Sequence, residues 1–134
     1  MIVVDTQMPM HMTVKGEDSQ LAELVRLRDP EWAAPVLWHS EYRNALLGRV
    51  RRDTVTAEEA EGCDRGAVRL IGGREHVPDS AAVLRVALAS KLTAYDAEFV
   101  VVARMLGVKL VTFDKQILAN CADVAVHPDR KSVV

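Results

Sequence analysis

The sequence predicts an α/β fold in which helices cover a parallel β-sheet. Three short runs of apolar, mostly β-branched residues support this prediction, because such runs are typical of strands buried on both faces. Much of the chain between them instead repeats apolar residues at the three- and four-residue spacing of helices. Strands that alternate with helices form parallel sheets with helical crossovers. The three runs are 2–4, 110–113 and 124–126.

In the N-terminal part of the chain, one strand precedes two helices. The strand is Ile2-Val3-Val4. After the polar residues 17–19, apolar residues recur at helical spacing as far as Pro30, and proline forces the residue before it out of helical geometry. Pro35 suits the first turn of a second helix over about 36–52.

Capping residues mark the starts of the later helices. Thr56 with Glu59 three residues on is a capping box, and it starts a helix that runs to about Leu70. Asp79 and Thr93 are N-cap candidates, and a short helix is expected after Asp114. The two predicted middle helices are 81–91 and 94–106, with glycines at 72–73 and 107 marking a break and a helix end.

Length and composition indicate one domain, 1–134, in a cytoplasmic protein. With 49% apolar and 27% charged residues the chain has a globular composition, and its net charge of −2 disfavours a broad basic coat for nucleic acid. Cys63 and Cys121 have no close Cys or His partner, which favours reduced thiols over a zinc site. No apolar run is long enough for a membrane span, and the first residues do not resemble a signal peptide.

Four carboxylates lie where a site at a sheet edge would form. Asp5 and Asp114 follow two predicted strands, and ligands of open parallel sheets bind at the carboxyl ends of strands. Asp96 lies in the first turn of a predicted helix, and Glu41 lies inside another. Each has an ordinary alternative role, because Asp is a good N-cap, an acid in a first turn complements the helix dipole, and a helical Glu is often solvated.

Together, the four carboxylates favour a divalent cation. They cannot all remain ionised in a low-dielectric pocket without a counter-charge. Mg²⁺ and Mn²⁺ prefer carboxylate oxygens and water, and they bind phosphate oxygens and activate water for hydrolysis. The spacing of the four residues does not by itself bring them together.

The whole chain resembles a PIN-domain protein, most closely the VapC-type toxin of bacterial toxin–antitoxin pairs. Four segments carry the resemblance, each with one of the acids in its place. They are Met1-Ile2-Val3-Val4-Asp5-Thr6, the stretch from Trp32 through Glu41 and Asn44 to Leu46, the stretch from Thr93 through Asp96 to Gly107, and Leu110-Val111-Thr112-Phe113-Asp114-Lys115.

This resemblance implies a three-layer α/β/α sandwich with a central parallel sheet. It also implies that Asp5, Glu41, Asp96 and Asp114 meet at one sheet edge and hold Mg²⁺ or Mn²⁺. The family's activity is endonucleolytic cleavage of RNA. Its members commonly dimerise and are silenced by a cognate antitoxin, a segment of which lies in the active-site groove, so a homodimer and an antitoxin partner are expected.

One segment departs from the family pattern. After Asp5-Thr6 the family has Asn and an apolar helical run, whereas this chain has Gln7-Met8-Pro9-Met10-His11-Met12. Because proline breaks a helix beyond its first turn, the first helix is expected to begin late, near residue 17, behind a loop beside Asp5.

The mechanistic hypothesis is metal-dependent hydrolysis of an RNA phosphodiester. Asp5, Asp96 and Asp114 are the expected main ligands, and Glu41 is expected to hold a water or a second ion. Thr112 is expected to hydrogen-bond an acid or the scissile phosphate, and Lys115 and Arg43 are the other candidate substrate contacts, although a strand threonine and a solvated lysine are also ordinary features.

The alternative is a PIN-like module that binds RNA or protein with weak or lost nuclease activity. The Gln7–Met12 segment favours it. A phosphoacceptor domain or an Asp-x-Asp phosphatase is disfavoured, because both need a second acid beside Asp5 and the chain has Thr6-Gln7 there.

Overall fold

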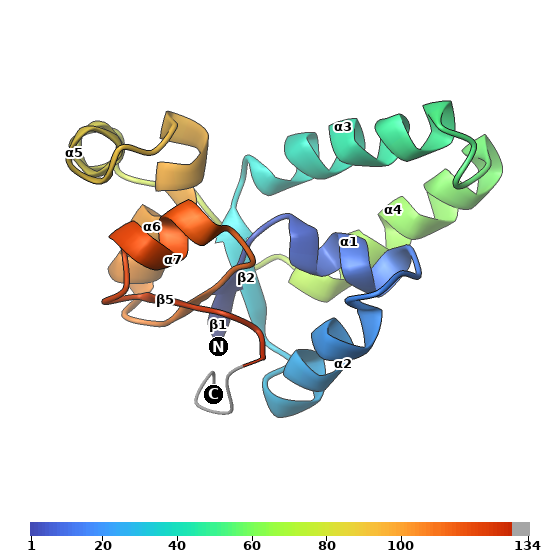
Figure 1. Ribbon diagram of the computed structural model, residues 1–134, viewed down its shortest axis with the longest axis horizontal. Helices are drawn as coiled ribbons and strands as arrows, with labels where there is room; N and C mark the ends of the chain where they lie inside the picture. Colours follow the sequence, from blue (N-terminus) through green and yellow to red (C-terminus); the bar gives the residue numbers. More distant parts are fainter. Residues whose placement is uncertain (130–134) are drawn as a thin grey trace.

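A computed structural model describes residues 1–129 of the chain as a parallel sheet with helices on both faces (Figure 1). All strand pairs are parallel, and their order across the sheet is β3-β2-β1-β4-β5. This is the three-layer α/β/α arrangement expected from the sequence. The strands are β1 (Ile2–Val4), β2 (Trp32–Pro35), β3 (Glu75–His76), β4 (Leu110–Val111) and β5 (Ala125–Val126).

Two groups of helices enclose the sheet. One group lies over one face, where α6 contacts β1, β2 and β4, and the other group covers the opposite face, where α1 and α4 contact the strands (Figure 1). The first group is α5 (Ser80–Ser90), α6 (Ala94–Leu106) and α7 (Lys115–Asn120). The second is α1 (Gln7–Thr13), α2 (Ser19–Arg28), α3 (Trp38–Arg51) and α4 (Ala57–Ile71).

The predicted caps are confirmed. Thr56 and Glu59 form both hydrogen bonds of the capping box at α4, and Asp79 and Thr93 cap α5 and α6 through their side chains. Gly107 ends α6 in the left-handed conformation, with φ +66°. These contacts satisfy backbone groups that a helix end leaves without a partner. Because the residues that make them lie close together in the sequence, these boundaries could be predicted from the sequence.

Two boundary predictions are wrong. Pro35 is the last residue of β2 and not the first turn of a helix, since α3 begins only at Trp38. The chain also forms α1 directly after Asp5-Thr6, without the expected loop. Pro9 is tolerated because it is the third residue of α1, where a backbone N–H would have no partner inside the helix. The strands β2 and β3 were not predicted.

The core lies on both sides of β1. The strand's three residues are buried, and so are Trp32 and Trp38, which are 0% and 1% exposed. Both tryptophans therefore serve packing.

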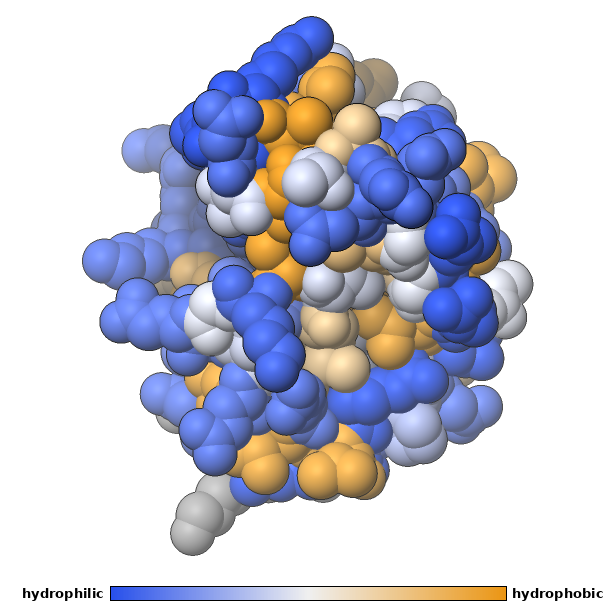
Figure 2. Space-filling view, turned by 90° about the vertical axis from the view of Figure 1, so that its right-hand side faces the viewer, coloured by the Kyte–Doolittle hydropathy of each residue, from blue (hydrophilic) through white to orange (hydrophobic). Residues whose placement is uncertain are grey.

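The helices α3 and α4 project from one end of the sheet (Figure 1). Seen from that end, hydrophobic residues form a strip between hydrophilic side chains (Figure 2). A groove between the two helices has the apolar residues Leu46, Leu47, Val50, Ala57 and Ala60 in its lining. Within residues 1–129, no helix has the length and apolar character needed to cross a membrane.

Candidate active site

The sheet topology creates a crevice at the carboxyl ends of β1 and β4. From β1 the chain runs to β2 and β3 on one side, and it reaches β4 and β5 on the other. In open α/β sheets, ligands bind at such a switch point. Asp5 directly follows β1, and Thr112, Phe113 and Asp114 directly follow β4.

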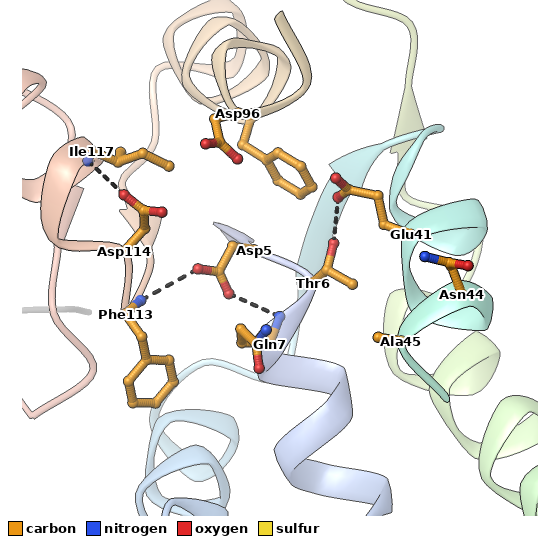
Figure 3. Close-up of a pocket in the computed structure, with 11 residues that line it drawn as sticks. Asp5, Thr6, Gln7, Glu41, Asn44, Ala45, Asp96, Phe113, Asp114 and Ile117 are labelled. Atoms are coloured by element: carbon orange, nitrogen blue, oxygen red, sulfur yellow. Dashed lines mark hydrogen bonds between the residues drawn. The ribbon is translucent and has the colours of Figure 1, made fainter. Parts of the chain in front are cut away.

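A pocket of about 520 Å³ occupies this crevice, and all four predicted acids line it (Figure 3). Asp5 and Asp114 come from the two strand ends, Asp96 from the first turn of α6, and Glu41 from the first turn of α3. The other lining residues are Thr6, Gln7, Asn44, Ala45, Phe99, Phe113 and Ile117. Among residues 1–129, no Lys, Arg or His lines the pocket, so this part of the chain supplies negative charge there without a cation.

Asp5 is buried at the bottom of this arrangement and is held by three donors. Thr112 and the backbone N–H of Phe113 donate to Oδ2, and the backbone N–H of Gln7 donates to Oδ1 at 3.0 Å. Burial nevertheless raises the pKa of Asp5 to about 6, because desolvation of the carboxylate outweighs these hydrogen bonds. The side chain of Asp5 is thus fixed in position and costly to ionise.

Thr112 connects two of the acids. Its hydroxyl donates to Asp5 and accepts the backbone N–H of Asp114 at 3.0 Å. Asp114 in turn caps α7 by accepting the backbone N–H of Ile117 at 2.9 Å. The expected hydrogen bond from Thr112 to an acid is therefore confirmed, and this side chain, which is 0% exposed, positions the carboxylates from beneath the pocket lining.

Glu41 is held by a residue that the sequence analysis did not identify. The Thr6 hydroxyl donates to Oε1 of Glu41 at 2.8 Å (Figure 3). Burial raises the pKa of Glu41, and the neighbouring charges of Asp96 and Glu98 raise it further. Its position directly after Asp5, at the same strand end, is the feature of the sequence that could have identified Thr6 as a site residue.

Asp96 takes part in the N-cap of α6 through its backbone and in the pocket through its side chain. Its backbone N–H donates to Thr93 Oγ1 at 3.1 Å, which is the local cap expected at the start of α6. Its carboxylate lines the pocket, where burial raises its pKa and the charge of Asp114 adds to the effect. The capping role and the pocket position therefore use different atoms of one residue.

The donor chemistry of the pocket fits a hard divalent cation. The carboxylates are oxygen donors, three of them have pKa values raised by burial, and no basic side chain from the described residues lines the pocket to neutralise them. Within residues 1–129, no three His, Cys, Asp or Glu side chains stand close enough to ligate a single ion. These residues fit an ion that keeps several waters and takes one or two carboxylates, which is the usual environment of Mg²⁺ in proteins.

The other predicted substrate contacts do not line the pocket. Arg43 faces the groove between α3 and α4, where its guanidinium contacts His39 and Ser40. Lys115 is exposed in the first turn of α7, directly after Asp114. Neither residue adds a cation to the lining.

Comparison with known proteins supports the fold. Neither a family model nor a curated protein matches the chain. Among solved structures, the chain is similar to the crystal structure of PAE2754 from Pyrobaculum aerophilum, with 25% sequence identity and a TM-score of 0.72. The likeness covers 96% of this chain and 90% of that one, so it extends over nearly the whole architecture.

Proposed function

We propose that this protein is a Mg²⁺- or Mn²⁺-dependent endoribonuclease of the PIN-domain type, which hydrolyses RNA phosphodiester bonds. The observation that carries the proposal is the pocket at the ends of β1 and β4, which four carboxylates line and to which the described part of the chain, 1–129, adds no basic side chain. Such a pocket repels a phosphodiester unless a cation is present, and a cation bound there attracts it.

Asp5, Asp96 and Asp114 are the residues that would hold the cation, directly or through water. When bound, the cation supplies charge neutralisation and Lewis acidity toward phosphate oxygens. Thr112 keeps the carboxylate of Asp5 and the backbone of Asp114 in a fixed relation, so the site is organised before substrate arrives.

Glu41 is assigned to the attacking water. One of its oxygens accepts the Thr6 hydroxyl, which orients the carboxylate toward the pocket. Its raised pKa brings it closer to neutral pH, where a general base is more effective. In this role Glu41 takes the proton from water as the water oxygen attacks phosphorus. The bond from phosphorus to the ribose oxygen breaks, and that oxygen keeps the electron pair and takes up a proton from solvent.

The resemblance of the four acid-bearing segments extends the proposal to the protein's partners. We place the chain as the toxin of a VapBC-type pair in the cytoplasm, acting as a homodimer and silenced by a cognate antitoxin. Leu84 and Leu88 on α5 are 60% and 84% exposed, and they offer apolar surface for such contacts.

The test is RNA cleavage by the purified protein with Mg²⁺, with Mn²⁺ and with EDTA. The wild type is expected to cut single-stranded RNA only with a divalent cation, and Asp5→Asn and Asp96→Asn are expected to lose at least about a hundredfold in rate. Glu23→Gln, which neutralises an exposed acid on α2, is the matched control and retains activity. Equal cleavage by all four proteins contradicts the proposal.

A second candidate function is a PIN-like binding module without nuclease activity. It is favoured by the absence, among the described residues, of three acids close enough to ligate one ion. The cleavage assay distinguishes the two candidates, because a binding module leaves the RNA intact both with and without Mn²⁺.

A further inference from the structure

Four of the six Phe, Tyr and Trp residues of the chain are buried. They are Trp32, Trp38, Tyr42 and Phe99, each 2% exposed or less. The two exceptions are Tyr95 and Phe113, and each directly precedes an acid of the pocket. They differ in one respect, since Phe113 lines the pocket and the 62%-exposed Tyr95 does not.

Phe113 is fixed at the pocket wall by its backbone and by two neighbouring rings. Its N–H donates to Asp5 at 3.3 Å. The ring of His11 on α1 packs edge-on at 4.9 Å between centroids, and the ring of His127 packs edge-on from another segment at 5.3 Å. In Figure 3 the Phe113 ring lies at the opposite end of the view from Asp96, across the carboxylates.

This cluster of rings adds a surface on which a base can stack, which the carboxylates of the pocket do not offer. Unstacked RNA bases bind on aromatic and imidazole rings, and this contact is independent of the phosphate charge. Burial lowers the pKa of His11, which favours the neutral imidazole beside Phe113. The cavity of about 520 Å³ falls within the range of about 300–1,000 Å³ that small-molecule sites occupy, so a nucleotide has room beside the ring.

We propose that Phe113, supported by His11 and His127, is the stacking position for the base next to the cleaved phosphate. The substrate is then single-stranded at that nucleotide, because a paired base in a duplex does not expose its face. This inference rests on the proposed RNA-cleaving function, and it assigns to Phe113 a role in substrate binding that the chemistry of the acids does not require.

The experiment measures binding of fluorescent octa-adenylate and octa-uridylate by anisotropy, with Ca²⁺ in place of Mg²⁺ and with intact RNA checked on a gel. The wild type is expected to bind octa-adenylate more tightly, because adenine presents the larger stacking surface. Phe113→Leu, which keeps an apolar side chain in the same packing, is expected to weaken octa-adenylate binding about tenfold and to reduce the preference for adenine. Phe113→Tyr keeps the ring and is expected to stay within about twofold of wild type.

Tyr95→Leu is the matched control, since it removes an exposed aromatic side chain that also precedes a pocket acid but does not line the pocket. Its affinity is expected to equal that of wild type. In cleavage assays, Phe113→Leu is expected to raise KM with little change in kcat, and its melting temperature shows whether the fold is intact.

Two different failures remain distinguishable. If wild type cleaves RNA but Phe113→Leu binds and cleaves like wild type, the stacking position is overturned and the nuclease proposal stands. The same holds if Tyr95→Leu weakens binding as much as Phe113→Leu does. If wild type neither binds nor cleaves RNA with any cation, the proposed function itself fails, and the stacking position fails with it.

Discussion

Replacing Asp5 with Asn is expected to change how the stability of the fold depends on pH. Asp5 is 9% exposed, and its burial raises its pKa from 3.8 to about 6. The folded state therefore holds the Asp5 proton more tightly than the unfolded state does. The resulting stabilisation is complete below the unfolded pKa of 3.8, and it is lost as the pH rises through the folded pKa of about 6.

The size of the effect follows from the two pKa values. Their difference corresponds to about 3 kcal/mol between low pH and pH values well above 6. Asn does not titrate, so the free energy of unfolding of Asp5→Asn should rise relative to wild type by about 3 kcal/mol across this interval. The amide also leaves one of the three donors around Asp5 without an acceptor, at a cost of about 1–3 kcal/mol that is the same at every pH.

The assay is urea unfolding in EDTA from about pH 4 to pH 8, followed by the fluorescence of the buried tryptophans. Asp123→Asn is the control, because Arg104 lowers the pKa of Asp123 below its ordinary value of 3.8, so its contribution is lost only below about pH 4 and this variant should run nearly parallel to wild type across the range. If the curves of wild type and Asp5→Asn run parallel across the pH range, the reasoning from burial is refuted.

Three further predictions concern the bound cation, the Thr6 hydroxyl and the N-cap of α4. Mn²⁺ at ten times its dissociation constant should stabilise the wild type by about 1.4 kcal/mol in thermal unfolding, and Asp96→Asn should lose this gain; equal shifts in both proteins place the ion elsewhere. Thr6→Val removes the donor that lowers the pKa of Glu41, so the acid limb of the kcat profile should move to higher pH; an unchanged limb contradicts the assigned role. Thr56→Ala breaks the capping box of α4 and should cost about 1 kcal/mol in urea unfolding without affecting RNA cleavage.

The helix boundaries that were predicted correctly depend on contacts between residues near in sequence. The capping box at Thr56 and the cap at Thr93 each join residues three positions apart, and Gly107 adopts a left-handed conformation that glycine favours. Such signals are complete within one turn of helix. They are therefore readable without knowledge of the fold.

The elements that were missed depend on neighbours distant in sequence. The β2 segment Trp32-Ala33-Ala34-Pro35 has two alanines and a proline, and it becomes a strand because it lies between β1 and β3. The two-residue strand β3 has no apolar pattern, and it exists only by pairing with Ala34 and Pro35. The position of Pro9 within α1 was misjudged because the start of that helix had no recognisable cap.

By itself, the sequence determined which four carboxylates to consider and where along the chain they lie. The tertiary structure decided that Asp5, Glu41, Asp96 and Asp114 line one pocket, because the parallel order of β1 and β4 brings two strand ends together and α3 and α6 add a helix start each. It also decided the pKa of Asp5 and the contacts of Thr6 and Thr112, since burial and hydrogen bonds across the sheet depend on residues up to about a hundred positions away. The type of each group is a local property of the sequence, whereas its environment is a property of the fold.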